Sequence, residues 1–117
     1  MLMIPETSKI YLKTGPTDMR KSIDGLAIMV VDLLKQDPQS GHLFLFRNRS
    51  GNKLKALHYE QNCFTLWYRR LEKGKYIFPK NAMGEIELDK AHLKWILASD
   101  KYSRMDALMP VNYHTYF

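Results

Sequence analysis

The sequence predicts a single α+β domain, in which a strand and a helix precede an antiparallel β-meander and a second helix. Three observations lead to this fold class. The chain has 117 residues, a length typical of one domain. Apolar residues recur with helical spacing over residues 19–34, whereas over residues 42–79 they form short runs separated by turn-forming residues. We therefore expect residues 1–99 to form the domain, and residues 100–117 to be a tail that is mobile unless its aromatic side chains dock on the core.

The first strand and the first helix occupy the N-terminal third of the chain. A strand is expected at residues 9–13, and Gly15-Pro16 ends it. Thr17 or Asp18 then caps a helix that runs to about Lys35. Most apolar residues of this helix lie three or four positions apart, which predicts one buried stripe. They are Met19, Ile23, Leu26, Val30, Leu33 and Leu34.

The meander is expected to contain four strands. They are residues 43–46, 53–60, 63–71 and 76–78. The first is apolar at each position, as a central strand covered on both faces would be. Turn-forming residues separate the strands at 49–52, 61–62 and 72–75, and Pro79 closes the segment.

A short strand and a second helix are expected after the meander. The strand is predicted at residues 85–88, and Asp89 then caps a helix that ends near Ser99. Three apolar residues of this helix are expected to face the core, namely Leu93, Ile96 and Leu97.

The charge of the chain is concentrated in the predicted meander. The whole chain carries a net charge of +6, but residues 42–80 hold nine lysines and arginines and only two acids, which is +7. The same segment is rich in aromatic residues. A solvated protein face explains many such segments. Cations beside exposed rings also form a nucleic-acid-binding surface, because rings stack on bases and cations contact phosphates.

A turn centred on Gln61-Asn62 predicts the pairing of the two long strands, because it pairs residues whose numbers add up to 123. Alternation then places one set of residues on a single face that is apolar at one end and cationic at the other. The apolar end contains Phe44, Phe46, Leu57, Tyr59, Phe64 and Leu66, and the cationic end contains Lys53, Lys55, Tyr68 and Arg70. A bound anion would relieve the repulsion between opposed cations, and so would simple solvent exposure.

Two further cations, Arg20 and Lys21, fall in the first turn of the predicted first helix, where the helix dipole disfavours positive charge. Pairing of Arg20 with Asp24 is the ordinary explanation. A cationic first turn would also suit contact with an anionic partner.

The residues give no positive case for an enzyme. Asp18, Asp24 and Asp32 are spaced so that they do not converge on one metal, and the four histidines lack metal-ligand spacing. Cys63 could act as a nucleophile with His58, but no third group orients them, and we expect Cys63 to be a small buried residue. No nucleotide-binding glycine loop is present. We therefore expect no catalytic residue, no cofactor and no metal.

The sequence shows no pattern typical of a secreted or membrane-spanning protein. A single cysteine excludes an internal disulfide, and the longest apolar run, residues 26–31, is far shorter than the ~20 residues of a membrane helix. No signal peptide is evident at the N-terminus. We expect a cytoplasmic protein that does not contact a membrane.

Several motifs together resemble one protein family over about residues 9–97. They are Tyr11-Leu12, Gly15 with Thr17-Asp18-Met19-Arg20-Lys21, Gly25-Leu26-Ala27, Asp37-Pro38, the run from Ser40 to Phe46, Asn48-Arg49, Lys55-Ala56-Leu57, the run from Arg69 to Tyr76, and Phe78-Pro79. The chain resembles the TnpB-type accessory protein, the product of the second open reading frame, of the insertion-sequence-sixty-six group of bacterial transposable elements. It departs from the family pattern at residues 58–60, where a tryptophan and an aspartate are usual, and at residues 61–63, where a glycine is usual.

The resemblance implies a role in transposition beside a separate, larger transposase that holds the catalytic carboxylates, with no known catalytic activity for this protein. The charge pattern adds DNA binding through backbone phosphates, and a homodimer through an exposed strand edge is conceivable. The residues expected to contact DNA are Arg20, Lys21, Arg47, Arg49, Lys53, Lys55, Tyr68, Arg69, Arg70, Lys73 and Lys75.

The alternative to DNA binding is a protein–protein adaptor that docks on the transposase through its aromatic strand face or its tail. If DNA binding is correct, replacing Lys53, Lys55 and Arg70 by glutamine should reduce affinity without unfolding the protein. Trp67 is expected to belong to the core rather than to stack on bases.

Overall fold

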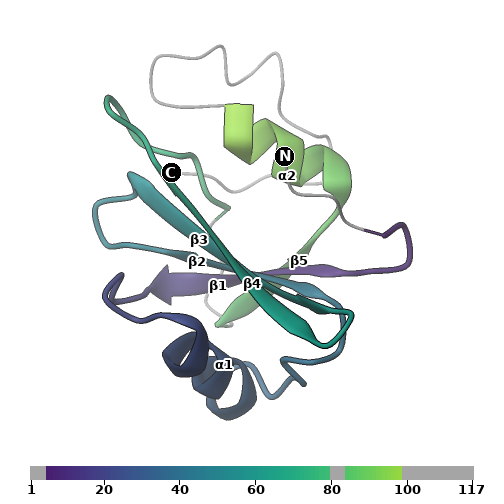
Figure 1. Ribbon diagram of the computed structural model, residues 1–117. Coiled ribbons are helices and arrows are strands. Elements are labelled where there is room, and N and C mark those ends of the chain that lie inside the picture. The colour runs from purple at the N-terminus through teal and green to yellow at the C-terminus, as the bar shows by residue number, and fades with distance from the viewer. Residues whose placement is uncertain (1–4, 80–83, 99–117) are drawn as a thin grey trace.

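A computed structural model describes residues 5–79 and 84–98 of the chain. In chain order the elements are β1 (Ile10–Pro16), α1 (Ile23–Asp32), β2 (Leu43–Arg47), β3 (Lys53–Glu60), β4 (Cys63–Arg70), β5 (Glu85–Leu88) and α2 (Lys90–Ala98). The strands form one five-stranded sheet, with α1 on one face and α2 on the other (Figure 1). The predicted α+β class is therefore confirmed. The predicted tail at residues 100–117 lies outside the described residues.

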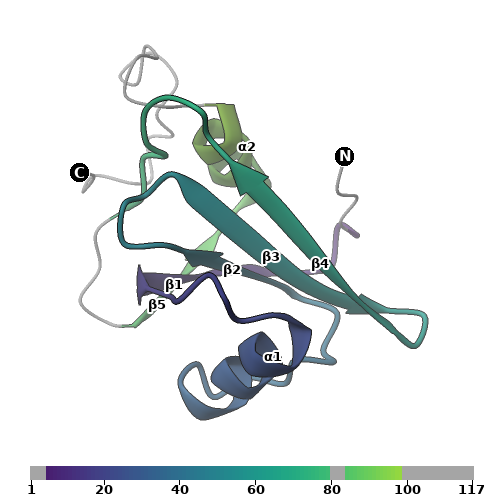
Figure 2. The same ribbon diagram turned by 60° about the vertical axis from the view of Figure 1, so that its left-hand side comes forward.

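The sheet is mixed, and its strand order is β4-β3-β2-β1-β5. β1 and β2 are parallel because α1 connects them, whereas β2, β3 and β4 follow one another as antiparallel neighbours. β5 returns antiparallel to β1 at the opposite edge, so the short strand predicted at residues 85–88 is confirmed. Figure 2 shows β3 and β4 as a long twisted hairpin that extends beyond the rest of the sheet.

The predicted fourth strand of the meander, at residues 76–78, is wrong. These residues are irregular, and all three side chains are buried in the core on the α2 face. The backbone N–H of Tyr76 donates a hydrogen bond to the carbonyl of Gly51 at 2.8 Å, which attaches the segment to the β2–β3 loop rather than to β4. A strand paired with β4 would point alternate side chains to opposite faces, so it could not bury three consecutive residues on one side.

Each face of the sheet has its own hydrophobic core. On the α1 face, Leu26 and Val30 of the helix pack against Phe44, Phe46 and Leu57 of the sheet. On the α2 face, Leu43 and Leu45 of β2 pack with residues 76–78 and with the helix. This arrangement confirms that β2, apolar at each of its first four positions, is a central strand covered on both faces.

The first helix is shorter than predicted. It begins after the N-cap Ser22 and ends at Asp32, instead of running from Thr17 or Asp18 to Lys35. β1 continues through Gly15-Pro16, and the Thr17 N–H then donates to the Arg47 carbonyl at 2.7 Å, which extends the pairing of β1 with β2. Residues 17–22 are therefore a crossing from the sheet to the helix. Leu33, predicted to face the core, is 60% exposed.

The second helix forms as predicted. The Asp89 carboxylate accepts a hydrogen bond from the His92 N–H at 2.7 Å, which caps the start of α2. Leu93 and Ile96 are buried, and Leu97 packs against the same core. Neither helix of the described part of the chain is long and apolar enough to cross a membrane.

Candidate nucleic-acid interface

The β3–β4 hairpin has the register that the sequence predicts. Gln61 and Asn62 both adopt left-handed backbone conformations, with φ of 49° and 64°, as a two-residue hairpin turn requires. The strands then pair from Lys53 with Arg70 to Glu60 with Cys63. The predicted face, apolar at one end and cationic at the other, is therefore present.

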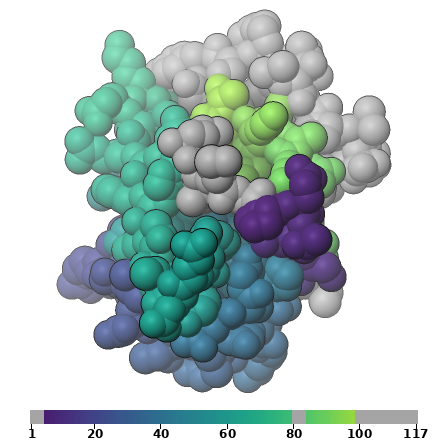
Figure 3. Space-filling model, turned by 45° about the vertical axis from the view of Figure 1, so that its right-hand side comes forward, coloured from purple at the N-terminus to yellow at the C-terminus, as the bar shows by residue number. Residues whose placement is uncertain are grey.

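The helix α1 covers only the apolar end of this face. Phe44, Phe46 and Leu57 are fully buried beneath it, whereas Tyr68 near the other end is 49% exposed. In Figure 3 the teal hairpin lies between blue residues of the α1 side and green residues of the α2 side. The cationic end is thus left beside the loop that leads into α1.

A cleft of about 720 Å³ opens at this cationic end. We call it the hairpin cleft. It is lined by Thr17, Asp18, Met19 and Arg20 of the β1–α1 loop, Asn48, Arg49 and Ser50 of the β2–β3 loop, and Lys53, Lys55, Leu66 and Tyr68 of the hairpin. Four cations and one carboxylate therefore face a common space, and an anion would be attracted to it.

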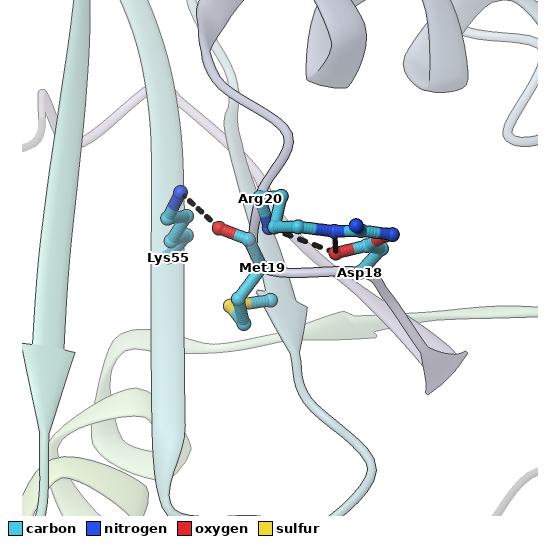
Figure 4. Close-up of polar contacts among 4 residues, drawn as sticks. All are labelled: Asp18, Met19, Arg20 and Lys55. Atoms are coloured by element: carbon cyan, nitrogen blue, oxygen red, sulfur yellow. Dashed lines mark hydrogen bonds and ion pairs between the residues drawn. The ribbon is translucent and has the colours of Figure 1, made fainter.

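Lys55 joins the two sides of the hairpin cleft. Its ammonium donates hydrogen bonds to the carbonyls of Met19, at 2.8 Å, and Lys21, at 2.7 Å. Figure 4 shows the first of these bonds, which reaches from β3 to the β1–α1 loop. The same nitrogen lies 5.5 Å from the centroid of the Tyr68 ring. Lys55 thus holds the loop in place, while its positive charge remains because carbonyl groups are neutral.

Arg20 pairs with Asp18, so the predicted pairing of Arg20 with Asp24 is wrong. Its guanidinium approaches the Asp18 carboxylate to 2.7 Å, and the Arg20 backbone N–H donates to the same carboxylate at 2.9 Å. These hydrogen bonds lower the pKa of Asp18 to about 2. Both side chains are in the loop before α1, so the expected conflict of Arg20 with the helix dipole does not arise (Figure 4).

Two cations of the hairpin cleft differ from the others in their contacts. Within the described residues, the side chains of Arg49 and Lys53 make no hydrogen bond or ion pair. Arg70, the cross-strand neighbour of Lys53, pairs with the exposed Glu72 at 3.1 Å. Arg49 and Lys53 are therefore the cations of the cleft that are most available to an anionic ligand.

Two of the other predicted DNA contacts, Arg47 and Arg69, lie outside the hairpin cleft. Alternation turns both toward the α2 face, where the Arg47 guanidinium lies 5.5 Å from the Phe78 ring centroid and that of Arg69 lies 5.7 Å from the Trp67 ring centroid. Arg47 also donates to the Thr14 carbonyl at 2.6 and 3.0 Å, and burial lowers its pKa.

The remaining cations of the prediction are exposed and lie in loops. Lys21 precedes α1, whereas Lys73 and Lys75 follow β4. Lys75 lies beside Gly51 of the β2–β3 loop, because a Cβ placed on Gly51 would lie 3.7 Å from the Lys75 Cβ. The structure thus associates Lys75 with the opposite side of the loop from Lys53.

Two asparagines that are not among the predicted site residues shape the β2–β3 loop. The Asn48 side chain donates to the Asn52 side chain at 2.7 Å and accepts a hydrogen bond from the Lys53 N–H at 2.9 Å. These bonds close the loop and set the direction in which Lys53 enters β3. The run of turn-forming residues at 49–52 predicted a turn, but the side-chain pair could not be read from composition.

Cys63 and His58, the nucleophile and base that the sequence could offer, differ in exposure. Cys63 is exposed, not buried as predicted. His58 is buried between the Gly41 carbonyl, at 3.1 Å, and the Glu60 carboxylate, at 3.3 Å. Among residues 5–79 and 84–98, no group of three histidine, cysteine or acidic side chains is arranged as a metal site.

Comparisons with known proteins agree with the resemblance in the sequence. A family model described as IS66 Orf2 like protein matches residues 8–107. Two relatives come from Sinorhizobium fredii (strain NBRC 101917 / NGR234). The uncharacterized protein y4hO is 35% identical over 98 residues, 84% of this chain and 85% of the relative. The uncharacterized protein y4jC is 28% identical over 97 residues, 83% of each chain. No solved structure matches this chain.

Proposed function

The chain belongs to the IS66 Orf2-like family, and from this premise we propose that it is a non-catalytic accessory protein of transposition that binds DNA through its backbone phosphates. It would assist a separate transposase at the ends of the element or at the target. Family membership is consistent with an accessory role. The hairpin cleft supports the binding mode.

The observation that carries this proposal is a pair of cations in the hairpin cleft whose side chains have no hydrogen bond or ion pair with any described residue. Arg49 and Lys53 face a space of about 720 Å³ that contains one carboxylate, and that carboxylate is already paired with Arg20. The half-exposed Tyr68 ring stands beside them. A phosphate would give both cations a partner, and a base could stack on the ring.

The expected affinity depends on salt. Each phosphate that a cation neutralises releases counterions, so the logarithm of the binding constant falls with the logarithm of salt concentration by about 0.9 per phosphate on duplex DNA and about 0.7 on a single strand. Contacts of this kind depend little on base sequence, which suits a protein that handles DNA beside a separate transposase.

Fluorescence anisotropy with labelled DNA between about 50 and 200 mM salt tests the proposal. The Arg49→Gln and Lys53→Gln double variant should bind more weakly and with a shallower salt dependence than the parent protein. Lys9→Gln is the matched control, because Lys9 precedes β1 at the end of the sheet opposite the β2–β3 loop. Absence of binding, or equal loss in the control and the double variant, would contradict DNA binding at this cleft.

A protein–protein adaptor is the second candidate, and the outer face of α1 favours it. Ile28 and Val31, which lie three positions apart on α1 and therefore on one side of the helix, are 59% and 49% exposed. The aromatic strand face expected to dock is instead buried beneath α1, as Phe44 and Phe46 illustrate. Among the described residues, the outer face of α1 is therefore the surface that favours docking on a transposase, and the tail at residues 100–117 lies outside them.

A further inference from the structure

A second cationic cleft lies on the other side of the β2–β3 loop from the hairpin cleft. It has a volume of about 390 Å³, and we call it the rear cleft. It is lined by Arg47, Arg49, Ser50, Gly51, Lys75 and residues 76–78. Three of these residues are cationic, and none of the described residues that line it is acidic. Its floor is apolar, since Ile77 and Phe78 belong to the core.

The two clefts meet at the β2–β3 loop. Arg49 and Ser50 line both of them, so the tip of the loop is a ridge between two cationic spaces. The Tyr76 N–H donates to the Gly51 carbonyl at 2.8 Å, and this bond holds the far wall of the rear cleft against the loop. Gly51 has a φ of +79°, a conformation that allows the loop to turn there.

A ligand that occupies both clefts must bend around the end of the sheet. Lys53 is on the α1 face, whereas Arg47 and residues 76–78 are on the α2 face. Duplex DNA is stiff over ~150 base pairs and bends at considerable cost. Its major groove admits a two-stranded β-ribbon, but here residues 17–20 and residues 75–78 flank the loop on its two sides. The β2–β3 loop and the two flanking segments together make this end of the molecule wider than a two-stranded ribbon, so it does not suit the major groove.

A single strand meets this requirement because its backbone turns freely between nucleotides. We propose that a single nucleic-acid strand crosses the β2–β3 loop, with phosphates bound in both clefts and Arg49 at the crossing. A base beside the hairpin cleft stacks on the exposed Tyr68 ring. This inference rests on the proposed function and names the form of the nucleic acid.

The experiment measures anisotropy of a labelled oligothymidine of about 16 nucleotides, and of a duplex of the same length, over the same salt range. The variants are Lys53→Gln for the hairpin cleft, Lys75→Gln for the rear cleft, the double variant, and the control Lys9→Gln. Lys75 is exposed, and glutamine keeps the Cβ and Cγ atoms of the stem beside Gly51. Circular dichroism verifies that each variant is folded.

We expect the single strand to bind more tightly than the duplex. Each single variant should reduce the salt dependence by about 0.7, the double variant by about 1.4, and Lys9→Gln by nothing. If Lys53→Gln weakens binding and Lys75→Gln does not, the strand does not cross the loop, and the proposed function stands. Tighter binding of the duplex, sensitive to Lys75, would also overturn the crossing. If neither variant changes binding, the proposed function fails together with this inference.

Discussion

At the scale of single residues, Lys53 and Lys55 of β3 differ in the hydrogen bonds that their side chains make. Lys53 and Lys55 point to the same face of β3, two positions apart. The ammonium of Lys55 is bonded to two carbonyls of the β1–α1 loop, whereas that of Lys53 makes no bond within the described chain. The sequence predicts a phosphate contact for both, and it does not reveal the role of Lys55 because the carbonyls that Lys55 meets are 34 and 36 residues away along the chain.

This difference predicts that Lys55→Gln destabilises the protein, contrary to the expectation drawn from the sequence. A hydrogen bond from a charged donor contributes about 1.5–3 kcal/mol, and partial exposure of this site reduces the effect, so we expect a loss of about 1–2 kcal/mol in the free energy of unfolding. Urea denaturation measures it. Lys53→Gln is the matched control and should change stability by less than about 0.5 kcal/mol. Equal effects of the two variants would show that the loop does not depend on Lys55.

At the scale of elements, the sequence predicts best where local chemistry decides the geometry. The β3–β4 hairpin follows from a two-residue turn and from alternation, so its register and its cationic face were both predictable. The start of α1 was not, because the pairing of Thr17 with Arg47 competes with a helix cap at Asp18. The strand predicted at residues 76–78 is wrong for a similar reason. Their hydrophobicity suits a strand, and only contacts with distant elements bury all three.

The outer face of α1 gives a prediction that separates the two candidate functions. Ile28→Ser with Val31→Ser should leave stability nearly unchanged, within about 0.5 kcal/mol for each exposed site. If the protein is an adaptor, this double variant should lose the transposase during co-purification from a nuclease-treated lysate, while its binding of DNA stays as in the parent. Lys53→Gln is the reciprocal control and should retain the transposase. A complex of the parent protein that disappears after nuclease treatment would contradict the adaptor.

At the scale of the whole molecule, the two faces of the sheet differ: the α1 face carries the hairpin cleft, and the α2 face contains the larger hydrophobic core. The α1 face carries the hairpin cleft at one end, and the β2–β3 loop connects it to the rear cleft on the α2 face. The α2 face contains the larger core, in which residues 76–78 and the helix pack against β1, β2 and β3. β4 is an edge strand, so pairing with a second copy stays a prediction.

The α2 core also predicts how global stability depends on pH. His92 is fully buried beside Trp95, and burial lowers its pKa from 6.5 to about 4. Between these values the unfolded chain binds a proton that the folded protein excludes, so the contribution of His92 to stability is complete above pH 6.5 and declines as the pH falls toward 4. The decline approaches about 1.4 kcal/mol per pH unit. Urea denaturation at several pH values, with His92→Gln as the comparison, measures it. The variant should be less stable at neutral pH but should lose less stability on acidification. Parallel pH profiles would show that His92 has similar pKa values in the folded and unfolded states, which would contradict the prediction.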